Sequence, residues 1–266
     1  MVSIIIPTYN RGYIIKKSID SVLHQTYEDF ELIIVDDGST DGTKQLIDEY
    51  EDDRIKYYSY EHNKGVVYAR NYGMKMAKGD YIAFQDSDDV WHRDKLEKQI
   101  QALEEDDSIA AVYCRLQYIL RDNMRMVLPG CDIDVDNMHG YIMKQLLSDN
   151  LIPCPCLIMR KDCYEDIGEF DDSFKALEDY DYVLRLAQKY KIGFINDILV
   201  DATISSDGIS SNDVNYIISS CQLLGKYKKE YLATDTFNKR LEKILTDAKE
   251  MHVKEQVIGM LELLLK

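Results

Sequence analysis

Membrane and secretion signals are absent from this sequence. No run approaches the ~20 apolar residues needed to span a bilayer, and the amino terminus lacks a basic segment followed by an apolar segment and a small-residue cleavage site. The chain also has no internal repeat and no low-complexity stretch. We therefore expect a soluble, cytoplasmic protein that contacts a membrane at most peripherally, at its inner face.

Basic residues are scarce relative to acidic ones. The chain has 32 lysines and arginines against 48 aspartates and glutamates, which gives a net charge of −16. A protein of this charge repels nucleic acid and anionic lipid, so we expect no nucleic-acid partner. Any anionic ligand must be bound by local basic groups or by a cation.

Zinc and redox patterns of cysteine are also missing. The six cysteines form no C-x-x-C pair and no zinc-like pairing with the five histidines, which predicts reduced and mostly buried thiols. Cys154 and Cys156 would share one face of a strand, where packing is the expected role. The six are Cys114, Cys131, Cys154, Cys156, Cys163 and Cys221.

Two common nucleotide-binding loops are absent, since neither G-x-G-x-x-G at the first turn nor a P-loop occurs. What the chain has is 266 residues of 45% hydrophobic content, enough for one large α/β domain or one domain with an appendage. Apolar runs alternate with amphipathic segments through the first hundred residues, which indicates βαβ units and a mostly parallel sheet flanked by helices. The predicted strands are Val2–Ile6, Leu32–Val35, Ile55–Tyr58 and Tyr81–Phe84.

Two helices are predicted between these strands. The first carries one apolar stripe, made of Ile15, Ile19, Val22 and Leu23. The second, near Gly65–Ala77, places Arg70 in the middle of its apolar face. A guanidinium there needs an anionic partner, and both a structural ion pair and a phosphate contact fit.

The second half of the chain has a different pattern. Residues 109–120 and 154–160 resemble strands, 122–151 is irregular with a short helix near Tyr141–Leu147, and Glu178–Tyr190 reads as a helix. Long loop-rich insertions often carry substrate specificity, so we expect 122–151 and 201–213 to select the acceptor of any transfer reaction.

The chain is predicted to be all-helical from about Val214. Glutamates dilute the positive charge near its apolar stripe, so packing against the preceding domain, or dimerisation, is favoured over a membrane surface. The stripe consists of Phe237, Leu241, Ile244, Ala248 and Met251, continued by Ile258, Leu261 and Leu265. The basic residues nearby are Lys226, Lys228, Lys229, Lys239, Arg240 and Lys243.

The most informative segment runs the apolar strand Tyr81–Phe84 into Asp86, Asp88 and Asp89. Ligands of open α/β sheets collect at the carboxyl ends of the strands. Crowded carboxylates resist ionisation unless a cation compensates them, and oxygen ligands suit Mg²⁺ or Mn²⁺ beside substrate phosphates. The alternative is a helix cap, on the expectation that a helix begins at Val90.

The ends of the first two strands should meet this acidic segment at the same edge of the sheet. Tyr9 can stack on a base, Asp37 can accept a hydrogen bond from the base or ribose, and Arg70 can add charge at a diphosphate. A nucleoside diphosphate therefore fits this group of side chains. A packed surface ring at Tyr9 and turn formation by Asp36 and Asp37 are the structural alternatives.

Five segments resemble, in order, the motifs of the family 2 inverting glycosyltransferases of GT-A fold. They are S-I-I-I-P-T-Y-N-R at 3–11, V-D-D-G-S-T-D-G-T at 35–43, G-V-V-Y-A-R-N at 65–71, G-D-Y-I-A-F-Q-D-S-D-D at 79–89 and L-E-D-Y-D at 177–181. The resemblance implies metal-dependent transfer of a sugar from a nucleoside diphosphate donor, above all a UDP-sugar, to a saccharide or lipid-linked acceptor in bacterial polysaccharide or glycoconjugate synthesis. The resemblance covers about residues 1–210. With the all-helical pattern that follows, it indicates a transferase domain over 1–213, with a donor half 1–105 and an acceptor half 106–213, and a helical appendage 214–266.

The same resemblance assigns roles to individual residues. Asp88 would hold Mn²⁺ or Mg²⁺, with Asp89 as a second candidate ligand, and Asp179 would be the catalytic base. Asp179 is expected at a helix start, where the helix dipole keeps a carboxylate ionised, although a helix N-cap would look the same. The donor contacts would be Pro7, Thr8, Tyr9, Arg11, Asp37, Arg70, Asp86 and Ser87.

The chain departs from the family pattern after its last core strand. Many family members carry a histidine there that can complete the metal site, but residues 199–210 contain none. Ser205, Asp207 or water would have to take that position. We therefore expect weaker metal binding without the donor than with it.

Two other functions compete with this interpretation. Asp86-x-Asp88-x-Val90 matches the nucleophile motif of haloacid-dehalogenase-like phosphatases, although that family places the motif on its opening strand. A non-catalytic nucleotide-sugar-binding subunit would explain the missing histidine, but not the presence of Asp179.

Overall fold

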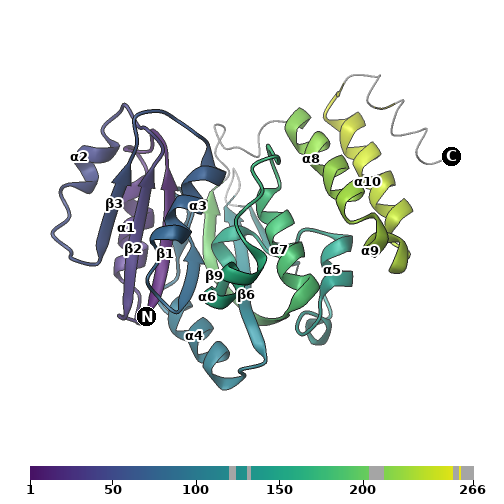
Figure 1. Cartoon of the computed structure of the whole chain (residues 1–266), viewed down its shortest axis with the longest axis horizontal. Coiled ribbons are helices and arrows are strands. Elements are labelled where there is room, and N and C mark those ends of the chain that lie inside the picture. Colours follow the sequence, from purple (N-terminus) through teal and green to yellow (C-terminus); the bar gives the residue numbers. More distant parts are fainter. Residues whose placement is uncertain (120–123, 131–132, 204–212, 254–257, 259–266) are drawn as a thin grey trace.

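The computed structural model describes residues 1–119, 124–130, 133–203, 213–253 and 258, and its central feature is a mixed nine-stranded sheet (Figure 1). The strand order is β3-β2-β1-β4-β8-β6-β9-β5, with β7 paired to β6. The strands are β1 (Val2–Thr8), β2 (Phe30–Asp36), β3 (Ile55–Ser59), β4 (Tyr81–Phe84), β5 (Val90–Trp91), β6 (Ile109–Ile119), β7 (Arg125–Leu128), β8 (Ile158–Arg160) and β9 (Lys191–Thr203). The helices are α1 (Ile15–Leu23), α2 (Thr43–Ile47), α3 (Val66–Met76), α4 (Lys95–Glu105), α5 (Met143–Ser148), α6 (Lys161–Ile167), α7 (Glu178–Lys189), α8 (Asp213–Lys226), α9 (Lys228–Ala233) and α10 (Phe237–Glu250).

The first four strands are parallel, as their apolar runs predict. β1 pairs with β2 and β4, and β2 pairs with β3, all in parallel register. Every residue of β1 and β2 is buried, which is why these strands are continuous apolar runs rather than alternating ones. Thr8 lies opposite Asp36, and Ile5 lies opposite Phe84. The carboxyl ends of β1, β2 and β4 therefore meet at one edge, as predicted.

The second half of the sheet is mixed. β6 and β9 are parallel, whereas β8 is antiparallel to both β4 and β6, and β5 is antiparallel to β9. The expectation of a strand over 154–160 is wrong for its first half, because Cys154–Cys156 is a 3₁₀ turn with a proline near its start. Both cysteines are buried there, so packing remains their role. The segment 122–151 also contains more regular structure than expected, since Arg125–Leu128 pairs with β6.

Helices pack closely on the parallel strands. α1 buries Ile15, Ile19 and Val22, as its stripe predicts. α3 approaches β1 closely at Gly73, where an added Cβ would lie 2.5 Å from Cγ2 of Ile5. Only glycine allows this contact, which fixes the position of α3 and its Arg70 above the strand ends.

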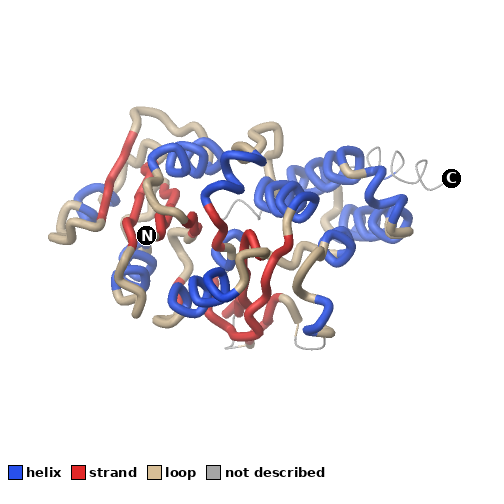
Figure 2. Tube along the Cα trace, turned by 60° about the horizontal axis from the view of Figure 1, so that its bottom comes forward, coloured by secondary structure: helices blue, strands red, loops and turns tan. Residues whose placement is uncertain are grey.

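The carboxyl-terminal helices α8, α9 and α10 lie together at the end of the molecule opposite β1, β2 and β3 (Figures 1 and 2). On α10 the predicted stripe packs inward, with Leu241, Ile244 and Ala248 buried; Leu261 and Leu265 lie outside the described residues. Lys226 is paired with Asp171 and Asp181. These contacts correspond to packing against the preceding domain, one of the predicted alternatives. No described helix is long and apolar enough to cross a bilayer.

Candidate active site

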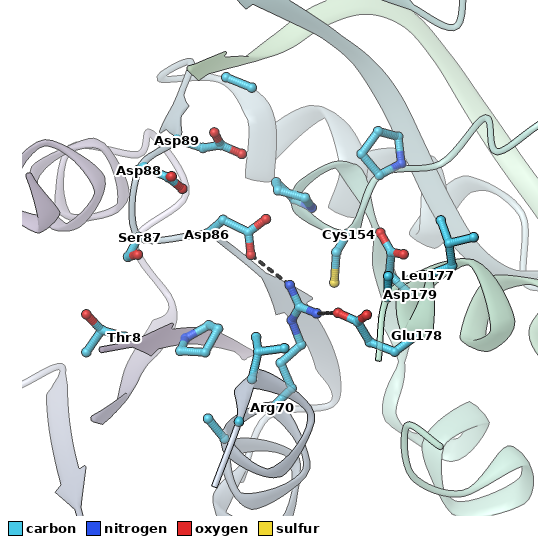
Figure 3. A pocket seen from close by; sticks show the side chains of 18 of the residues that line it. Thr8, Arg70, Asp86, Ser87, Asp88, Asp89, Cys154, Leu177, Glu178 and Asp179 are labelled. Carbon is cyan, nitrogen blue, oxygen red and sulfur yellow. Dashed lines mark hydrogen bonds and ion pairs between the residues drawn. The ribbon is translucent and has the colours of Figure 1, made fainter. Parts of the chain in front are cut away.

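A cavity of about 780 Å³ opens at the carboxyl ends of β1, β2 and β4, between the two halves of the sheet (Figure 3). Every residue predicted to bind the donor, the metal or the reacting hydroxyl lines it. These residues are Pro7, Thr8, Tyr9, Arg11, Asp37, Arg70, Asp86, Ser87, Asp88, Asp89 and Asp179. The topology thus gathers residues as distant in sequence as Pro7 and Asp179, as the parallel strand ends predict.

The end of β2 contains one structural and one cavity-lining aspartate. Asp36 accepts a hydrogen bond from the backbone N–H of Ser39 at 2.8 Å and from the Tyr57 hydroxyl at 2.7 Å, so it is a turn former. Asp37 lines the cavity and accepts backbone N–H bonds from Lys64 and Gly65, at 2.6 and 2.8 Å. Asp37 therefore ties the start of α3 to β2 as well as facing the ligand space.

The end of β1 supplies an aromatic ring and an unsatisfied hydroxyl. Tyr9 is 44% exposed at the cavity, which leaves its ring accessible. Thr8 is buried, and its hydroxyl has no hydrogen-bond partner among the described residues. Buried hydroxyls are nearly always paired, so the Thr8 hydroxyl is available for a ligand. The Arg11 guanidinium donates to the Tyr13 hydroxyl at 2.8 Å.

Arg70 forms the structural ion pair that was one of its two predicted roles. Its buried guanidinium donates to Oε1 of Glu178 at 2.7 Å and to Oδ1 of Asp86 at 2.9 Å (Figure 3). The Phe170 ring lies 5.7 Å from the guanidinium. Arg70 therefore connects α3, the end of β4 and the start of α7 across the cavity.

The acidic segment after β4 does not cap a helix. Val90–Trp91 is a short strand rather than the start of a helix, and α4 begins only at Lys95 with Asp94 before it. Val90–Trp91 is a strand because of tertiary structure, since β5 pairs with β9. The helix-cap alternative for Asp86, Asp88 and Asp89 is therefore wrong.

Negative charge is concentrated where the acidic segment meets the cavity (Figure 3). Asp89 is buried, and burial followed by repulsion from Asp86 and Asp88 raises its pKa well above the usual range. Arg70 is paired with Asp86, but burial and the charges of Asp86 and Asp88 still disfavour ionisation of Asp89. A divalent cation at this segment would favour the ionised carboxylates.

The residues present fit a metal that is held jointly with a ligand. Within the described ranges, no three His, Cys, Asp or Glu side chains converge to hold an ion. Asp88 and its neighbours can therefore supply only part of a coordination shell, and Mg²⁺ characteristically completes such a shell with water and substrate phosphates. Ser205 and Asp207, the suggested replacements for the missing histidine, lie outside the described residues.

Asp179 is the second residue of α7, and it is not the N-cap. Leu177 occupies the cap position in a left-handed conformation with φ of 59°. Oδ1 of Asp179 accepts the backbone N–H of Tyr180 at 2.7 Å. Burial, and next the charge of Glu178, raise the pKa of Asp179 to about 7, although Arg70 acts in the opposite direction. The helix dipole was expected to keep this carboxylate ionised, but with a pKa of about 7 it is only partly ionised at neutral pH, because burial and the neighbouring carboxylate outweigh the dipole. A pKa near neutrality suits a general base.

Several lining residues were not predicted. Glu178 stands beside Asp179 in a segment whose motif was recognised, but its partner Arg70 is 108 residues away. Tyr216 on α8 and Arg240 on α10 reach the cavity from the carboxyl-terminal helices. The amphipathic pattern of those helices indicates a buried face but not which surface it covers.

Known proteins with similar sequences are sugar-transfer enzymes. The sequence model of glycosyl transferase family 2 matches residues 3–168. The putative teichuronic acid biosynthesis glycosyltransferase TuaG of Bacillus subtilis is 47% identical over 216 residues, which cover 80% of this chain and 82% of TuaG. The UDP-Glc:α-D-GlcNAc-diphosphoundecaprenol β-1,3-glucosyltransferase WfgD of Escherichia coli is 33% identical over 237 residues, which cover 88% of each chain.

Solved structures share the fold. TarS residues 1–349 of S. aureus, in complex with UDP-GlcNAc, aligns with a TM-score of 0.74 over 95% of this chain and 76% of that one, at 21% identity. The mannosyltransferase PcManGT of Pyrobaculum calidifontis, in complex with GDP-Man and Mn²⁺, aligns with a TM-score of 0.68 over 94% of this chain and 75% of that one, at 19% identity.

Proposed function

The chain belongs to glycosyl transferase family 2 and is an inverting glycosyltransferase of GT-A fold, and on this premise we propose that it uses a UDP-sugar and a lipid-linked acceptor. The proposed reaction belongs to the assembly of a bacterial surface polysaccharide at the inner face of the membrane. The names of WfgD and TuaG support the setting, and the TarS complex with UDP-GlcNAc supports the donor. The observation that carries the proposal is one cavity lined both by the crowded carboxylates of Asp86, Asp88 and Asp89 and by a carboxyl group with a pKa of about 7.

The donor nucleotide is assigned to the ends of β1 and β2. The accessible ring of Tyr9 would stack on the base, and Asp37 would accept a hydrogen bond from the base or ribose. The unpaired hydroxyl of Thr8 is available to the nucleotide. Pro7, Arg11 and Ser87 complete this part of the cavity wall, and Asp86 would face the donor sugar or ribose with the oxygen that Arg70 does not use.

Mn²⁺ or Mg²⁺ is the proposed cofactor, with Asp88 as its principal ligand and Asp89 beside it. When bound, the ion would offset the charge of the donor diphosphate as it leaves. Arg70 is not a free cation for this purpose, because both of its terminal nitrogens are already bonded to carboxylates. Its proposed contribution to nucleotide binding is to orient Asp86.

Asp179 would accept the proton of the acceptor hydroxyl as that oxygen attacks the anomeric carbon. The C–O bond to the diphosphate breaks as the new glycosidic bond forms, and the proton remains on the Asp179 carboxyl. A single displacement of this kind inverts the anomeric configuration. Glu178 cannot replace Asp179 without losing its bond to Arg70.

The alternative functions are less consistent with the site. In a phosphatase of the haloacid-dehalogenase type, Asp86 would be the nucleophile, but here it is paired with Arg70 and follows the fourth strand of the chain. A non-catalytic subunit would have no use for a carboxyl group whose pKa is near neutrality. Family membership favours the transferase over both.

An acceptor-dependent transfer assay tests the proposal. UDP-sugars are supplied with an alkyl-diphosphate-linked N-acetylglucosamine, and we expect release of UDP together with a product of inverted configuration. Asp179→Asn should lower kcat by about 10²–10⁴-fold with UDP affinity retained. Asp172→Asn, at an exposed carboxylate before α7, is the control. Release of free phosphate would indicate the phosphatase, and donor binding without transfer would indicate the non-catalytic subunit.

The metal assignment is tested at Asp88. Asp88→Asn should sharply reduce metal-dependent transfer, whereas Asp80→Asn, at the exposed start of the same strand segment, should not. Calorimetry should show weak Mn²⁺ binding to the free protein and tighter binding once UDP is present, because the diphosphate supplies missing ligands. Tight binding to the free protein, or full metal-dependent transfer by Asp88→Asn, contradicts the assignment.

A further inference from the structure

Arg240 is a buried cation that the proposed reaction does not yet use. It lies on α10, is only 5% exposed, and lines the same cavity as Asp179. Its guanidinium lies 5.5 Å from the centre of the Tyr180 ring. This contact places Arg240 against the first turn of α7, the helix that also carries the proposed base.

Among the described residues, no carboxylate forms an ion pair with Arg240, although the charge of Asp149 acts on it. Its Nε is buried without a hydrogen-bond partner, and no ion pair of its side chain is found within the described ranges. Asp149 also lines the cavity, but it is paired with Lys243 at 2.9 Å. An aromatic face compensates a buried guanidinium only in part, and removing a charge from water without an ionic partner is costly.

The position of Arg240 separates it from the donor nucleotide. The proposed nucleotide contacts lie at the ends of β1 and β2, whereas α10 belongs to the helical group at the other end of the molecule (Figure 1). Asp179 lies on α7, which lies between these two ends (Figure 1). A ligand group that meets Arg240 is therefore on the acceptor side of the base.

We propose that Arg240 binds a phosphate group of the acceptor, which is then a glycosyl diphosphate rather than a neutral saccharide. This inference rests on the proposed function and specifies its acceptor. The planar guanidinium presents paired N–H donors that match phosphate oxygens, and the surrounding protein shields the contact from water. In a chain with a net charge of −16, a cavity-lining arginine that has no ion pair among the described residues favours the binding of an anionic group beside it.

Binding of small anionic probes tests this directly. The protein is first saturated with UDP and Mg²⁺, so that the donor end is occupied, and butyl diphosphate, butyl glucuronide and butyl glucoside are then titrated by calorimetry. We expect the diphosphate to bind most tightly. Arg240→Gln should weaken diphosphate binding roughly 10- to 100-fold and leave the glucoside unaffected, as expected for loss of a charge-assisted hydrogen-bonded pair.

Two further variants separate recognition from packing. Arg240→Lys keeps the charge without the planar fork and should lose only part of the affinity for the diphosphate. Lys239→Gln removes a neighbouring exposed charge on α10 and should change nothing. If Arg240→Gln fails to fold, the relative affinities of the wild-type protein and of Arg240→Lys for the three probes still test whether Arg240 binds a phosphate group.

Three results would overturn the inference. They are equal affinity of the wild-type protein for diphosphate and glucoside, equal weakening of all three probes by Arg240→Gln, and tighter binding of the glucuronide than of the diphosphate. These measurements do not require sugar transfer. An enzyme that binds the diphosphate through Arg240 but transfers no sugar would instead contradict the proposed function.

Discussion

Two adjacent carboxyl groups at the start of α7 have different environments and hence different roles. Glu178 is buried and bonded to Arg70 at 2.7 Å. Asp179 accepts a hydrogen bond from the backbone N–H of Tyr180, and its pKa is raised to about 7. Glu178 thus positions Arg70 and also adds the repulsion that keeps its neighbour basic enough to accept a proton.

The pH dependence of transfer follows from this arrangement. Asp179 must be deprotonated to act as the base, so kcat/KM should fall about tenfold per pH unit below its pKa of about 7 and level off above it. Glu178→Gln removes the repulsion and should move this acidic limb to lower pH. Measurement of kcat/KM for the donor against pH in both proteins checks the shift. An unchanged limb in Glu178→Gln would mean that Glu178 does not influence the base.

Arg70 should be important for stability as well as for the site. Arg70→Met leaves Glu178 buried without its cation and frees Asp86, which should lower the free energy of unfolding by about 3–5 kcal/mol. Urea denaturation measures this loss. Arg54→Met, at a more exposed pair with Asp52, is the matched control and should cost less than about 1 kcal/mol. Equal losses in the two variants would contradict a structural role for the Arg70 pair.

The location of a site residue could be predicted from the sequence where the residue directly follows a recognisable strand. Asp88 and Asp89 follow an apolar strand, and their location at a ligand edge could be predicted from that alone. The sequence could not distinguish a structural ion pair of Arg70 from a phosphate contact, because its partner Glu178 is distant in sequence. The raised pKa of Asp179 could not be predicted either, since burial is a property of the folded chain rather than of the helix that carries the residue.

At the level of elements, the contact between α3 and β1 positions one wall of the cavity. Gly73→Ala would place a methyl group 2.5 Å from Cγ2 of Ile5, a branched side chain in the core. Overpacking costs about 1–3 kcal/mol, which should exceed the helix-propensity gain of about 1 kcal/mol and give a net loss of stability.

Gly225→Ala is the matched control, because an added Cβ there meets nothing within 4 Å and the residue lies inside α8. It should stabilise the protein by about 0.5–1 kcal/mol. Urea denaturation of the two variants should therefore give changes of opposite sign. A gain in both would show that α3 can move away from β1 at little cost.

Elements were predictable where the local pattern decides them. β1, β2 and β4 are buried on both faces, so their apolar runs identify them without knowledge of their partners. Val90–Trp91 was expected to be helical, but its pairing with β9 makes it a strand. The 3₁₀ turn at Cys154–Cys156 likewise interrupts a run whose side chains resemble those of a strand.

At the scale of the whole molecule, the two halves are joined by polar contacts that are long-range in sequence. Asn71 on α3 donates to the Phe170 carbonyl at 3.0 Å and accepts the Phe170 N–H at 2.8 Å, both in a buried environment. The carboxyl-terminal helices are joined to α7 through Asp181, whose side chain is fully buried. It bonds to Arg185, Lys226 and Tyr227 at 3.0, 2.7 and 2.8 Å. The bonds from Lys226 and Tyr227 to the buried Asp181 carboxylate therefore join the two sides of the proposed domain boundary at residue 213.

These links predict that the transferase domain and the helical appendage unfold together, in one calorimetric transition. Tyr227→Phe removes a buried hydrogen bond to a carboxylate and should lower the stability of the whole chain by about 1.5–3 kcal/mol. Tyr190→Phe removes a bond of the same kind, to Asp166 at an exposed site, and should have a much smaller effect. A first transition that Tyr227→Phe shifts while a second transition stays in place would mean that the appendage unfolds independently. If the chain unfolds as one unit, removing the hydrogen bond between Tyr227 and Asp181 also destabilises the cavity wall that contains Arg240 and Asp179.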